Sequence, residues 1–474
     1  MILTIDLGTT TLKAALFSED GRVCSIRHVT LDKPSSTHEI DPIHWSKALA
    51  KACNTLGDLS LVRAVVISGN GPTLVPVLGK PESKDGFLYA KTAMARTWLD
   101  RRPVAESAEI SEILGTFVDS GFFLPKALFL YRNEKKTYEE SLWLLSSHEY
   151  LDYLLTGEAK AVIHSDDSTQ WYWTDDLVAR LGLDKHKFPP FCNPGDLIGP
   201  ISNLASATLS LPPGIPVFAG APDFYVSILG TGTVEVGQVC NRSGTSEGIN
   251  LCTQKPLGDP RLMTYRHPIE PYYNVSGIIS TSGKAIEWAK NLVGSNDTSF
   301  GDLYAKMAEA EPGCGGVVFL PYLSGERAPI WDPDARAVFS GLNLQTGSNE
   351  LLRSVAEGTC FAMRDVITVM EELGSKVGQL RITGGPSESD FMNQLKADIT
   401  GREVLVPAMQ DAELMGCLII ALKALGLFAS YKEASYAVVQ AKHIFTPDPT
   451  VQKLYDELFN AYRSLKQGRI PKKE

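Results

Sequence analysis

The stretch Ile2-Leu3-Thr4-Ile5-Asp6-Leu7-Gly8-Thr9-Thr10 decides the fold that this sequence predicts. We expect paired strands at 2–5 and 12–17 around a tight turn at 6–11, followed by a third strand at 23–29. Because glycine lets a ligand approach the backbone closely, the N–H groups and threonine hydroxyls of such a turn can bind phosphate. Taken alone, the turn is either a phosphate site or an ordinary hairpin.

A similar turn, Ser243-Gly244-Thr245-Ser246, lies between expected strands at 238–242 and 248–252. The similarity is too weak to count as a sequence repeat, but each turn opens one half of the chain, which favours nucleotide binding. A chain of 474 residues exceeds the roughly 250–300 residues of a single core. We therefore expect an α/β protein of two domains, 1–239 and 240–474.

Composition excludes several classes of protein. The net charge of −10 and the scattered basic residues argue against a nucleic-acid partner. The eight cysteines form no C-x-x-C pair, which argues against a zinc site or a disulfide framework and favours the cytoplasm. The amino terminus carries no basic leader, and no apolar run approaches the ~20 residues of a membrane span. We expect a cytoplasmic protein without a membrane partner.

An isolated carboxylate, Asp223, follows the apolar run 215–219 and the segment Gly220-Ala221-Pro222. It can act as the general base that takes a proton from an acceptor hydroxyl in phosphoryl transfer. An aspartate in such a place more often caps a helix, here the one expected at 224–229, and both interpretations can hold together. Asp6, at the end of the first strand, can hold Mg²⁺ through water. No G-x-x-x-x-G-K-[ST] or G-x-G-x-x-G motif occurs, which excludes P-loop and Rossmann binding.

The remaining expected elements frame these segments. We expect a helix from Pro42 with Asp41 as its N-cap, and a buried strand at 62–68. Further helices are expected at 126–131, 147–155, 283–292 and 349–373, with a strand at 380–382 that leads into the turn Thr383-Gly384-Gly385.

With these motifs the sequence resembles the FGGY carbohydrate kinases, which share a superfamily with actin and a class of heat-shock chaperones. The resemblance covers nearly the whole chain, which is similar overall to xylulokinases. It is most specific at Gly325-Glu326-Arg327 to Arg336. The other matching motifs are Glu39 to Trp45, Trp98-Leu99-Asp100-Arg101-Arg102, Leu155-Thr156-Gly157-Glu158, Gly220-Ala221-Pro222-Asp223, Ser243-Gly244-Thr245-Ser246, Pro321-Tyr322-Leu323-Ser324, Thr383-Gly384-Gly385-Pro386, Asn393-Gln394 with Ala397-Asp398, and Glu413-Leu414-Met415-Gly416.

The resemblance implies two actin-like (ribonuclease H-like) domains with ATP and Mg²⁺ in the cleft between them. It makes Asp223 the base and Asp6 the metal-side carboxylate. The residues that it implies for the nucleotide are Gly8, Thr9, Thr10, Gly244, Thr245, Gly384 and Gly385. On the sugar side we expect Asn70, Trp98 and Asp100, while Arg102 either braces the pocket or reaches the ligand. Glu326, Arg327 and Asp332 are expected to brace the second domain.

The sequence departs from xylulokinases on the sugar side. Those enzymes carry S-G-Q-M-H-G where this chain has Ser68-Gly69-Asn70-Gly71-Pro72-Thr73, so Pro72 replaces the histidine that usually contacts sugar. Pro386 also replaces the third glycine of the adenosine turn, and its fixed φ makes the fit there an open point. One wall of the expected acceptor pocket therefore differs from that of the family.

Three functions follow. The first is an ATP-dependent kinase acting on a hydroxyl of a small ketose or polyol, a xylulose-like sugar among them. The second is a non-catalytic sugar or nucleotide sensor that keeps the kinase fold, and the third is a chaperone-type ATPase, which the G-E-R and W-D-P strings disfavour. The expected partner is a small sugar or polyol. The sequence does not decide whether the protein forms a homodimer, which sugar it uses or which hydroxyl is phosphorylated.

Overall fold

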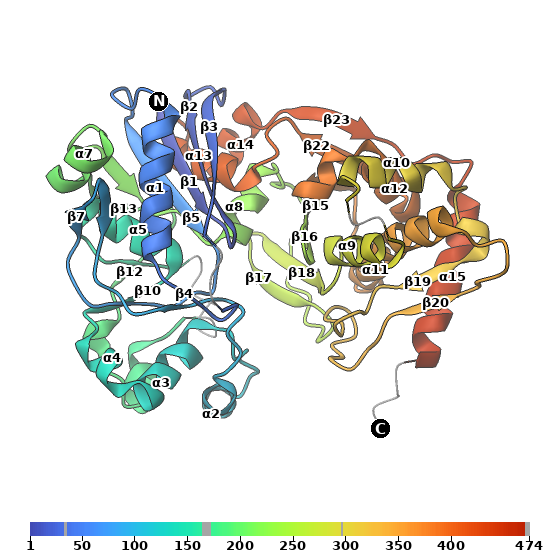
Figure 1. The fold of residues 1–474 in the computed structure, drawn as a ribbon, viewed down its shortest axis with the longest axis horizontal. Helices are drawn as coiled ribbons and strands as arrows, with labels where there is room; N and C mark the ends of the chain where they lie inside the picture. The colour runs from blue at the N-terminus through green and yellow to red at the C-terminus, as the bar shows by residue number, and fades with distance from the viewer. Residues whose placement is uncertain (33–35, 164–171, 295–296, 470–474) are drawn as a thin grey trace. The chain divides into compact units, whose positions relative to one another are not determined.

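The computed structural model describes residues 1–32, 36–163, 172–294 and 297–469, which Figure 1 shows as a ribbon. These residues form two compact units. Unit 1 comprises Met1–Gly230 with Ala412–Val438, and unit 2 comprises Thr231–Asp411 with Val439–Glu474. The predicted division had a single boundary at 239/240. It did not anticipate that 412–438 returns to the first unit.

The sheet of unit 1 contains the opening segment of the chain. Its strand order is β13 (Leu197–Pro200), β14 (Pro216–Phe218), β5 (Ala64–Gly69), β1 (Ile2–Leu7), β2 (Thr11–Phe17) and β3 (Val23–Thr30). β1 pairs antiparallel with β2 and parallel with β5, which is itself parallel to β14. Every residue of β1 and β5 is buried, as expected for strands that are covered on both faces.

Helices cover both faces of this sheet. α1 (Ile43–Leu56) contacts β2 and β3 and lies in front of the sheet in Figure 1, and α13 (Ala412–Ala424) contacts β1 and β5. α13 also packs closely along α8 (Asp223–Gly230). A Cβ atom on Gly416 would lie 1.9 Å from the carbonyl oxygen of Val226, so the two helix backbones can approach this closely only because residue 416 is glycine. This packing makes unit 1 discontinuous in sequence.

Shorter elements complete unit 1. A group of helices with its own apolar core includes α2 (Val104–Leu114), α3 (Phe123–Asn133), α4 (Lys135–Glu140) and α6 (Asp175–Arg180). The strand pairs are β4 (Glu39–Ile40) with β9 (Ala95–Arg96), β6 (Val75–Val77) with β10 (Trp143–Leu145), β7 (Glu82–Lys84) with β8 (Phe87–Tyr89), and β11 (Ala161–Val162) with β12 (Phe191–Cys192). α5 (Ser147–Thr156), α7 (Asn203–Leu209) and α14 (Tyr431–Val438) are the other α-helices of the described part of unit 1.

Unit 2 repeats the topology of the first sheet. Its order is β17 (Met263–Arg266), β18 (Tyr273–Ile279), β16 (Glu247–Thr253), β15 (Gln238–Ser243), β21 (Gln379–Thr383), β22 (Glu403–Pro407) and β23 (Ala441–Phe445). β15 pairs antiparallel with β16 and parallel with β21, as β1 does with β2 and β5. The weak sequence similarity between the two halves therefore corresponds to a clear repeat of the strand arrangement.

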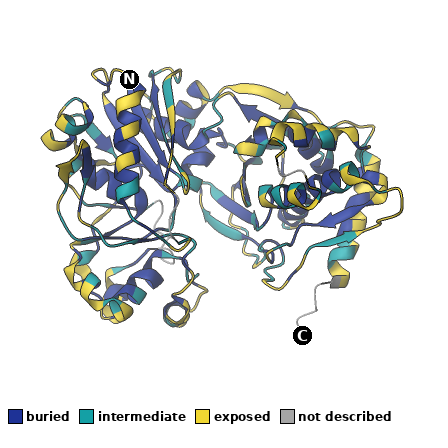
Figure 2. Cartoon of the chain, in the orientation of Figure 1, coloured by how far each residue is buried: buried dark blue, intermediate teal, exposed yellow. Residues whose placement is uncertain are grey.

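The helices of unit 2 enclose a large apolar core. They are α9 (Gly283–Leu292), α10 (Phe300–Glu309), α11 (Ser348–Glu372), α12 (Asp390–Thr400) and α15 (Gln452–Arg469), and a further strand pair is β19 (Val318–Leu320) with β20 (Val338–Ser340). Figure 2 shows that the central strands of both large sheets are mainly buried, whereas the edge strands β3 and β23 are mostly exposed and the helices outside the sheets expose one side.

The predicted elements are confirmed with bounds that shift by one to three residues, and α9 matches its predicted range. The structure assigns α1 from Ile43, but Pro42 already has helical backbone angles, with φ −58° and ψ −13°. Asp41 Oδ1 accepts the N–H of Ile43 at 3.0 Å, which is the hydrogen bond expected of an N-cap.

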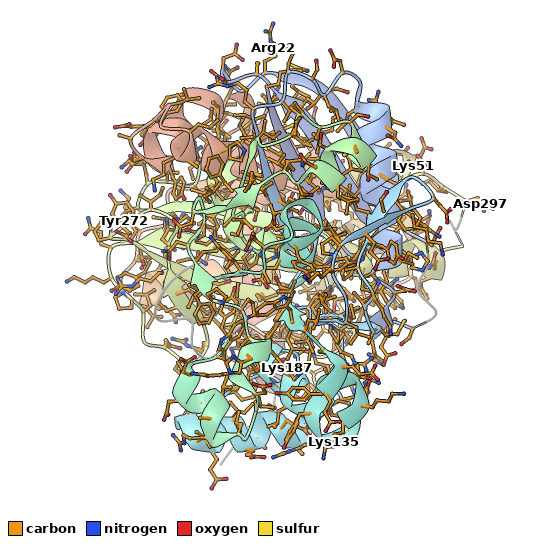
Figure 3. The ribbon with its side chains drawn as sticks, turned by 90° about the vertical axis from the view of Figure 1, so that its left-hand side faces the viewer. Arg22, Lys51, Lys135, Lys187, Tyr272 and Asp297 are labelled. Carbon is orange, nitrogen blue, oxygen red and sulfur yellow. The ribbon has the colours of Figure 1, made fainter. Side chains whose placement is uncertain are left out.

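Two observations on the described residues bear on the predicted class of protein. Within the described ranges, no helix combines the length and apolar character needed to cross a bilayer. Exposed basic side chains of unit 1 such as Arg22, Lys51 and Lys135 project from separate places, as Figure 3 shows. This scatter agrees with the absence of basic clustering noted in the sequence.

Candidate active site

Asp6 is a buried carboxylate at the end of β1. Ser68, on the neighbouring strand β5, donates its hydroxyl to Asp6 Oδ1 at 2.7 Å. Burial, followed by repulsion from Glu413, raises the pKa of Asp6 to about 7, and the Lys13 ammonium and the Ser68 hydrogen bond only partly oppose this rise. Asp223 also adds repulsion. The structure therefore gathers three carboxylates, Asp6, Glu413 and Asp223, near the carboxyl end of β1.

Glu413 and Lys13 had no predicted role in this cluster. Glu413 lies in the first turn of α13, and its Oε2 is 3.9 Å from Lys13 Nζ. The register of β1 and β2 places Lys13 directly opposite Asp6, which the length of the turn already implied. Glu413 stood in a family motif, but no local pattern could show that it returns to the first strand.

Asp223 is the first residue of α8 and is partly exposed. Its position follows from the parallel pairing of β5 and β14, which continues as a bridge between Gly69 and Pro222. An acidic residue in the first turn of a helix is stabilised by the N–H groups there, so the capping and catalytic interpretations of Asp223 are compatible. The carboxylate is held at the same edge of the sheet as Asp6.

The turn after β1 is joined to the predicted sugar side. Gly8 closes the turn by donating its N–H to the Thr11 carbonyl at 3.0 Å, and the Thr9 and Thr10 side chains are exposed. Trp98 Nε1 donates to Thr9 Oγ1 at 3.0 Å. A residue predicted for the nucleotide and one predicted for the acceptor are thus in direct contact.

The segment that departs from xylulokinases is held by interactions inside unit 1. Asn70 donates its side-chain N–H to the Leu7 carbonyl at 3.0 Å, and its Oδ1 accepts the Thr73 hydroxyl at 2.8 Å. Lys126, on α3, donates to the Pro72 carbonyl at 2.7 Å. Burial, only partly offset by Asp100, lowers the pKa of Lys126 to about 7. The predicted substrate residue Asn70 therefore shapes the turn at 70–73 with its own polar groups.

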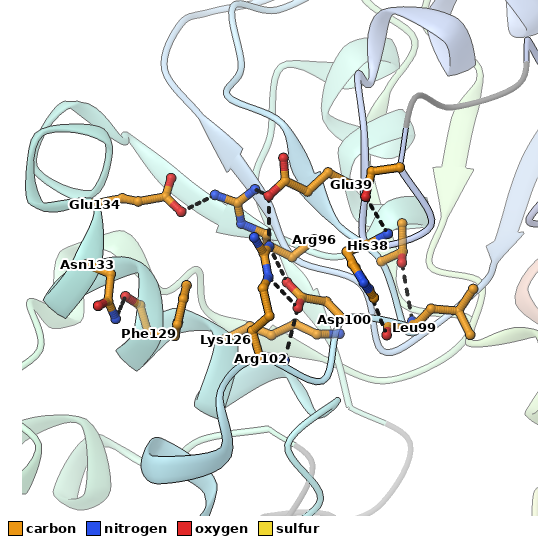
Figure 4. Close-up of polar contacts among 12 residues, drawn as sticks. His38, Glu39, Arg96, Leu99, Asp100, Arg102, Lys126, Phe129, Asn133 and Glu134 are labelled. Carbon is orange, nitrogen blue, oxygen red and sulfur yellow. Dashed lines mark hydrogen bonds and ion pairs between the residues drawn. The ribbon is translucent and has the colours of Figure 1, made fainter.

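Asp100 is buried and held by Arg102, as Figure 4 shows. Arg102 donates from Nε and Nη2 to the two carboxylate oxygens at 2.8 and 2.7 Å, and it also bonds Glu39 at 2.8 Å. Burial opposes the charged form of Asp100, but these bonds outweigh it and hold its pKa below the ordinary value. Of the two interpretations of Arg102, the geometry favours bracing.

The network continues outward through Arg96, which pairs with Glu39 and Glu134 (Figure 4). These side chains line a hollow of about 500 Å³ together with Asp41, Thr92, Ala93, Met94 and Thr137. Neither Asp6 nor Asp223 lines this hollow, so it is separate from the carboxylate cluster.

The second predicted phosphate turn lies between β15 and β16 in unit 2, with Gly244 and Thr245 exposed at its tip. Gly384 follows β21 with a φ of +93°, and a Cβ atom there would lie 1.9 Å from the Ser243 carbonyl oxygen. Only glycine accommodates both the positive φ and this contact. Unit 2 thus brings the predicted phosphate turn beside the predicted adenosine turn, whose next residue, Gly385, is exposed.

Pro386 fits the adenosine turn without conflict, because it is the second residue of a short 3₁₀ helix, Gly385–Glu388. The fixed φ of proline suits the start of a helical turn.

Glu326 and Arg327 lie away from the turns in sequence and form hydrogen bonds within unit 2. Glu326 accepts the N–H groups of Ser280 and Arg327 at 2.6 and 2.8 Å, in agreement with bracing.

The carboxylate cluster of unit 1 suits a hard cation. Asp6 and Glu413 would offer it oxygen ligands, and their mutual repulsion is the kind that a bound cation relieves. Among the described residues no group of three or more His, Cys, Asp or Glu is placed so that the group could hold a metal ion. Mg²⁺ needs no such group, because it keeps several waters and binds through one or two carboxylates.

Comparison with known proteins now identifies the chain. Its residues 1–230 match the N-terminal domain, and residues 239–425 the C-terminal domain, of the FGGY family of carbohydrate kinases. The chain belongs to the FGGY family of carbohydrate kinases. It is therefore a phosphotransferase of sugar metabolism, and kinases of this family use ATP.

Relatives of the whole chain agree with this assignment. The chain is 28% identical over 422 residues to the xylulose kinase of Escherichia coli, which covers 85% of this chain and 86% of the relative. A crystal structure of a xyloylose kinase from Brucella ovis is 26% identical, with a TM-score of 0.85 and 98% of both chains covered. The gluconate kinase of Lactobacillus acidophilus shares the fold, with a TM-score of 0.84 at 23% identity over 98% of this chain and 97% of that one. The predicted two-domain actin-like fold is confirmed, and these relatives favour a kinase over a non-catalytic sensor.

Proposed function

We propose that this kinase transfers the γ-phosphoryl group of ATP to a hydroxyl group of a small ketose or polyol, with Asp223 as general base. The carrying observation is the arrangement of unit 1. There Asp223 lies in the same carboxylate cluster as Asp6, and the turn at Thr9 is hydrogen-bonded to Trp98. In this proposal the turn that binds phosphate and the carboxylate that removes the proton lie on the same edge of one sheet.

Asp223 accepts the proton of the acceptor hydroxyl as that oxygen forms its bond to the γ-phosphorus. The bond from the γ-phosphorus to the bridging oxygen breaks, ADP leaves with the electron pair, and Asp223 later releases the proton to solvent. Proton removal by a positioned carboxylate accelerates such a step by about 10²–10⁴-fold. The Asp223 carboxylate can do this because it is partly exposed at the start of α8.

The two glycine-containing turns bind the nucleotide in this proposal. Gly8, Thr9 and Thr10 offer N–H and hydroxyl donors to phosphate in unit 1, and Gly244 and Thr245 do so in unit 2. Gly384 and Gly385 lie against the adenosine. Asp6, with Glu413, would hold Mg²⁺, and that ion would neutralise charge on the phosphates when it is bound.

The acceptor side is formed by the 70–73 turn, Trp98 and Asp100. Since Asn70 and Asp100 are engaged by internal partners, Asn70 sets the shape of this wall and Asp100 offers only lone pairs that Arg102 leaves unused. Relatives named as xylulose kinase and gluconate kinase both share this fold, so the acceptor can be a neutral ketose or a sugar acid. Because the 68–73 segment differs from that of xylulokinases, the acceptor has to be identified by assay.

The test is ADP formation by the purified protein with ATP, magnesium and a panel of xylulose, ribulose, hexuloses, tetritols, glycerol and gluconate. We expect turnover with at least one acceptor. ATP binding without turnover on any of them would reject the proposal and support the sensor, which predicts thermal stabilisation by ligands without ADP. A homodimer and a cytoplasmic location stay predictions from the sequence, and light scattering after size exclusion tests the first.

A further inference from the structure

A buried ion pair lies directly behind the second glycine turn. Lys396, on α12, is 2% exposed, and so is Glu247, the first residue of β16. The lysine Nζ donates to Glu247 Oε1, Ser243 Oγ and Asn241 Oδ1, each at 2.6 Å. A lysine ammonium has three N–H donors, so all of them are used within this cluster.

The cluster is satisfied throughout. Glu247 Oε1 also accepts from Asn241 Nδ2 at 2.8 Å and from Ser243 Oγ at 2.7 Å, and its Oε2 accepts the Ser282 hydroxyl at 2.6 Å. Burial works against the ionised form of Glu247, but the lysine charge and these hydrogen bonds outweigh it and hold the pKa of Glu247 below its ordinary value. Glu247 is therefore ionised in the folded protein.

A buried pair of this kind is weak evidence for a role in stability. Removing two charges from water costs several kcal/mol per ion, and apolar residues of similar volume in the same place are often as stabilising or more so. What distinguishes this pair is its location. It joins the two ends of the Ser243–Ser246 turn to a helix, because Ser243 precedes the turn's tip and Glu247 follows it.

The same cluster orients the carbonyl groups of the turn. Ser282, which bonds Glu247, also donates its backbone N–H to the Thr245 carbonyl at 3.1 Å, and Gly283 donates to the Gly244 carbonyl at 3.0 Å. The two carbonyl oxygens at the tip are thus engaged by the start of α9. An anion site requires donors rather than acceptors, so this arrangement removes the groups that would repel phosphate.

The pair also connects the phosphate turn with the adenosine turn. α12, which carries Lys396, begins immediately after the Gly384–Glu388 segment, and Asn393 on that helix donates to the Ser387 carbonyl at 2.9 Å. Gly384 in turn packs against the Ser243 carbonyl. The Ser243–Ser246 turn and the Gly384–Gly385 turn are therefore both attached to α12, the first through Lys396 and the second through Asn393.

We propose that Lys396 and Glu247 are positioning residues for the nucleotide: they fix the Ser243–Ser246 turn relative to the Gly384–Gly385 turn. This inference rests on the proposed function, in which unit 2 binds the nucleotide. Neither side chain touches the nucleotide, because both are fully enclosed. Loss of the pair weakens nucleotide binding and leaves the interaction with the acceptor unchanged.

The test compares three variants with the wild type. K396M removes the ammonium, K396M/E247Q removes both charges, and R353M is the matched control, since Arg353 forms a buried pair with Glu357 in the same unit and contacts neither turn. MgADP binding is measured by calorimetry, thermal unfolding by scanning calorimetry, and the KM values for ATP and for the acceptor by ADP formation.

We expect K396M to bind MgADP about tenfold more weakly, by analogy with the loss seen when a hydrogen-bond partner behind a metal ligand is removed. Its KM for ATP rises similarly, while the acceptor KM stays within twofold. R353M loses thermal stability and keeps the wild-type affinity for MgADP. K396M/E247Q regains thermal stability, because no charge stays buried alone, but it keeps the weaker binding.

Unchanged MgADP affinity in K396M, or in K396M/E247Q if the single variant does not fold, overturns the positioning role. An equal loss of affinity in R353M overturns it as well, since the effect would then follow from stability. If the wild type binds MgADP but phosphorylates no acceptor, the proposed function fails while the comparison of affinities still decides the role of the pair. Absence of MgADP binding by the wild type rejects both.

Discussion

Replacing Asp223 by asparagine removes the proposed base while keeping the volume of the side chain and a polar group at the start of α8. Three neighbouring carboxylates are already engaged by other groups. Asp6 is buried and accepts from Ser68, Glu413 faces Lys13, and Asp100 is held by two bonds from Arg102. The variant should therefore lose the whole contribution of the base.

The size of the loss follows from this lack of a substitute. General base catalysis contributes about 10²–10⁴-fold. At about 1.36 kcal/mol for each factor of ten, the barrier should rise by roughly 3–5 kcal/mol. Because the nucleotide contacts are untouched, the KM for ATP should change by less than about threefold, so that the loss appears almost entirely in kcat.

The assay is initial-rate ADP release across ATP and acceptor concentrations, together with MgADP calorimetry on the same preparations. Asp175 provides the matched control, because it is also an acidic residue at the first position of a helix, α6, and lies outside the carboxylate cluster. D175N removes a similar helix-end charge, worth about 0.3–1 kcal/mol of stability, and should keep wild-type kcat. A D223N enzyme with more than a tenth of wild-type kcat would refute the assignment of the base.

Three further predictions concern the turns and the core. W98F removes the indole N–H that bonds Thr9, which should raise the KM for ATP or acceptor by about 2–10-fold, and unchanged kinetics would show that the contact is idle. G384A places a Cβ against the Ser243 carbonyl at a positive φ, so we expect a loss of more than about 1 kcal/mol in unfolding free energy and weaker MgADP binding, whereas wild-type values for both would contradict the close approach. Burial raises the pKa of Asp152 well above 3.8, and its oxygens have no hydrogen-bond partner. The folded protein therefore keeps that proton at pH values where the unfolded chain has lost it, and stability falls as the pH rises from about 4 toward the folded pKa. D152N should lower the difference in melting temperature between pH 5 and pH 8, and an unchanged difference would show that Asp152 does not cause it.

Much of the fold followed from local patterns. The strands around 6–11 and 243–246, the buried strand β5 and the helix α9 are each specified by a run of apolar residues bounded by glycine, threonine or serine. Such signals depend only on neighbours in sequence. The predicted site residues also came from local motifs, and the structure places Asp6, Asp223, Thr9 and Trp98 on one edge of the first sheet.

The roles of several side chains could not be predicted in this way. Asn70 matched the expected sugar side, yet its amide is engaged by Leu7 and Thr73, and only packing reveals that. Glu413 and Lys126 had no predicted role because their partners, Lys13 and Pro72, are distant in sequence. Arg102 was assigned to bracing only when its two bonds to Asp100 were known.

By itself, the sequence determined that two strand–turn–strand modules with glycine-containing turns occur, and that one carboxylate follows the apolar run before 220. These features are local, because turn chemistry and strand periodicity are set by adjacent residues. Only the tertiary structure decided that 412–438 returns to the first unit and carries Glu413 to Asp6. It alone also showed that Lys396 lies behind the second turn. Both depend on contacts between residues more than 100 positions apart, which form when apolar faces are buried together and which no local pattern encodes.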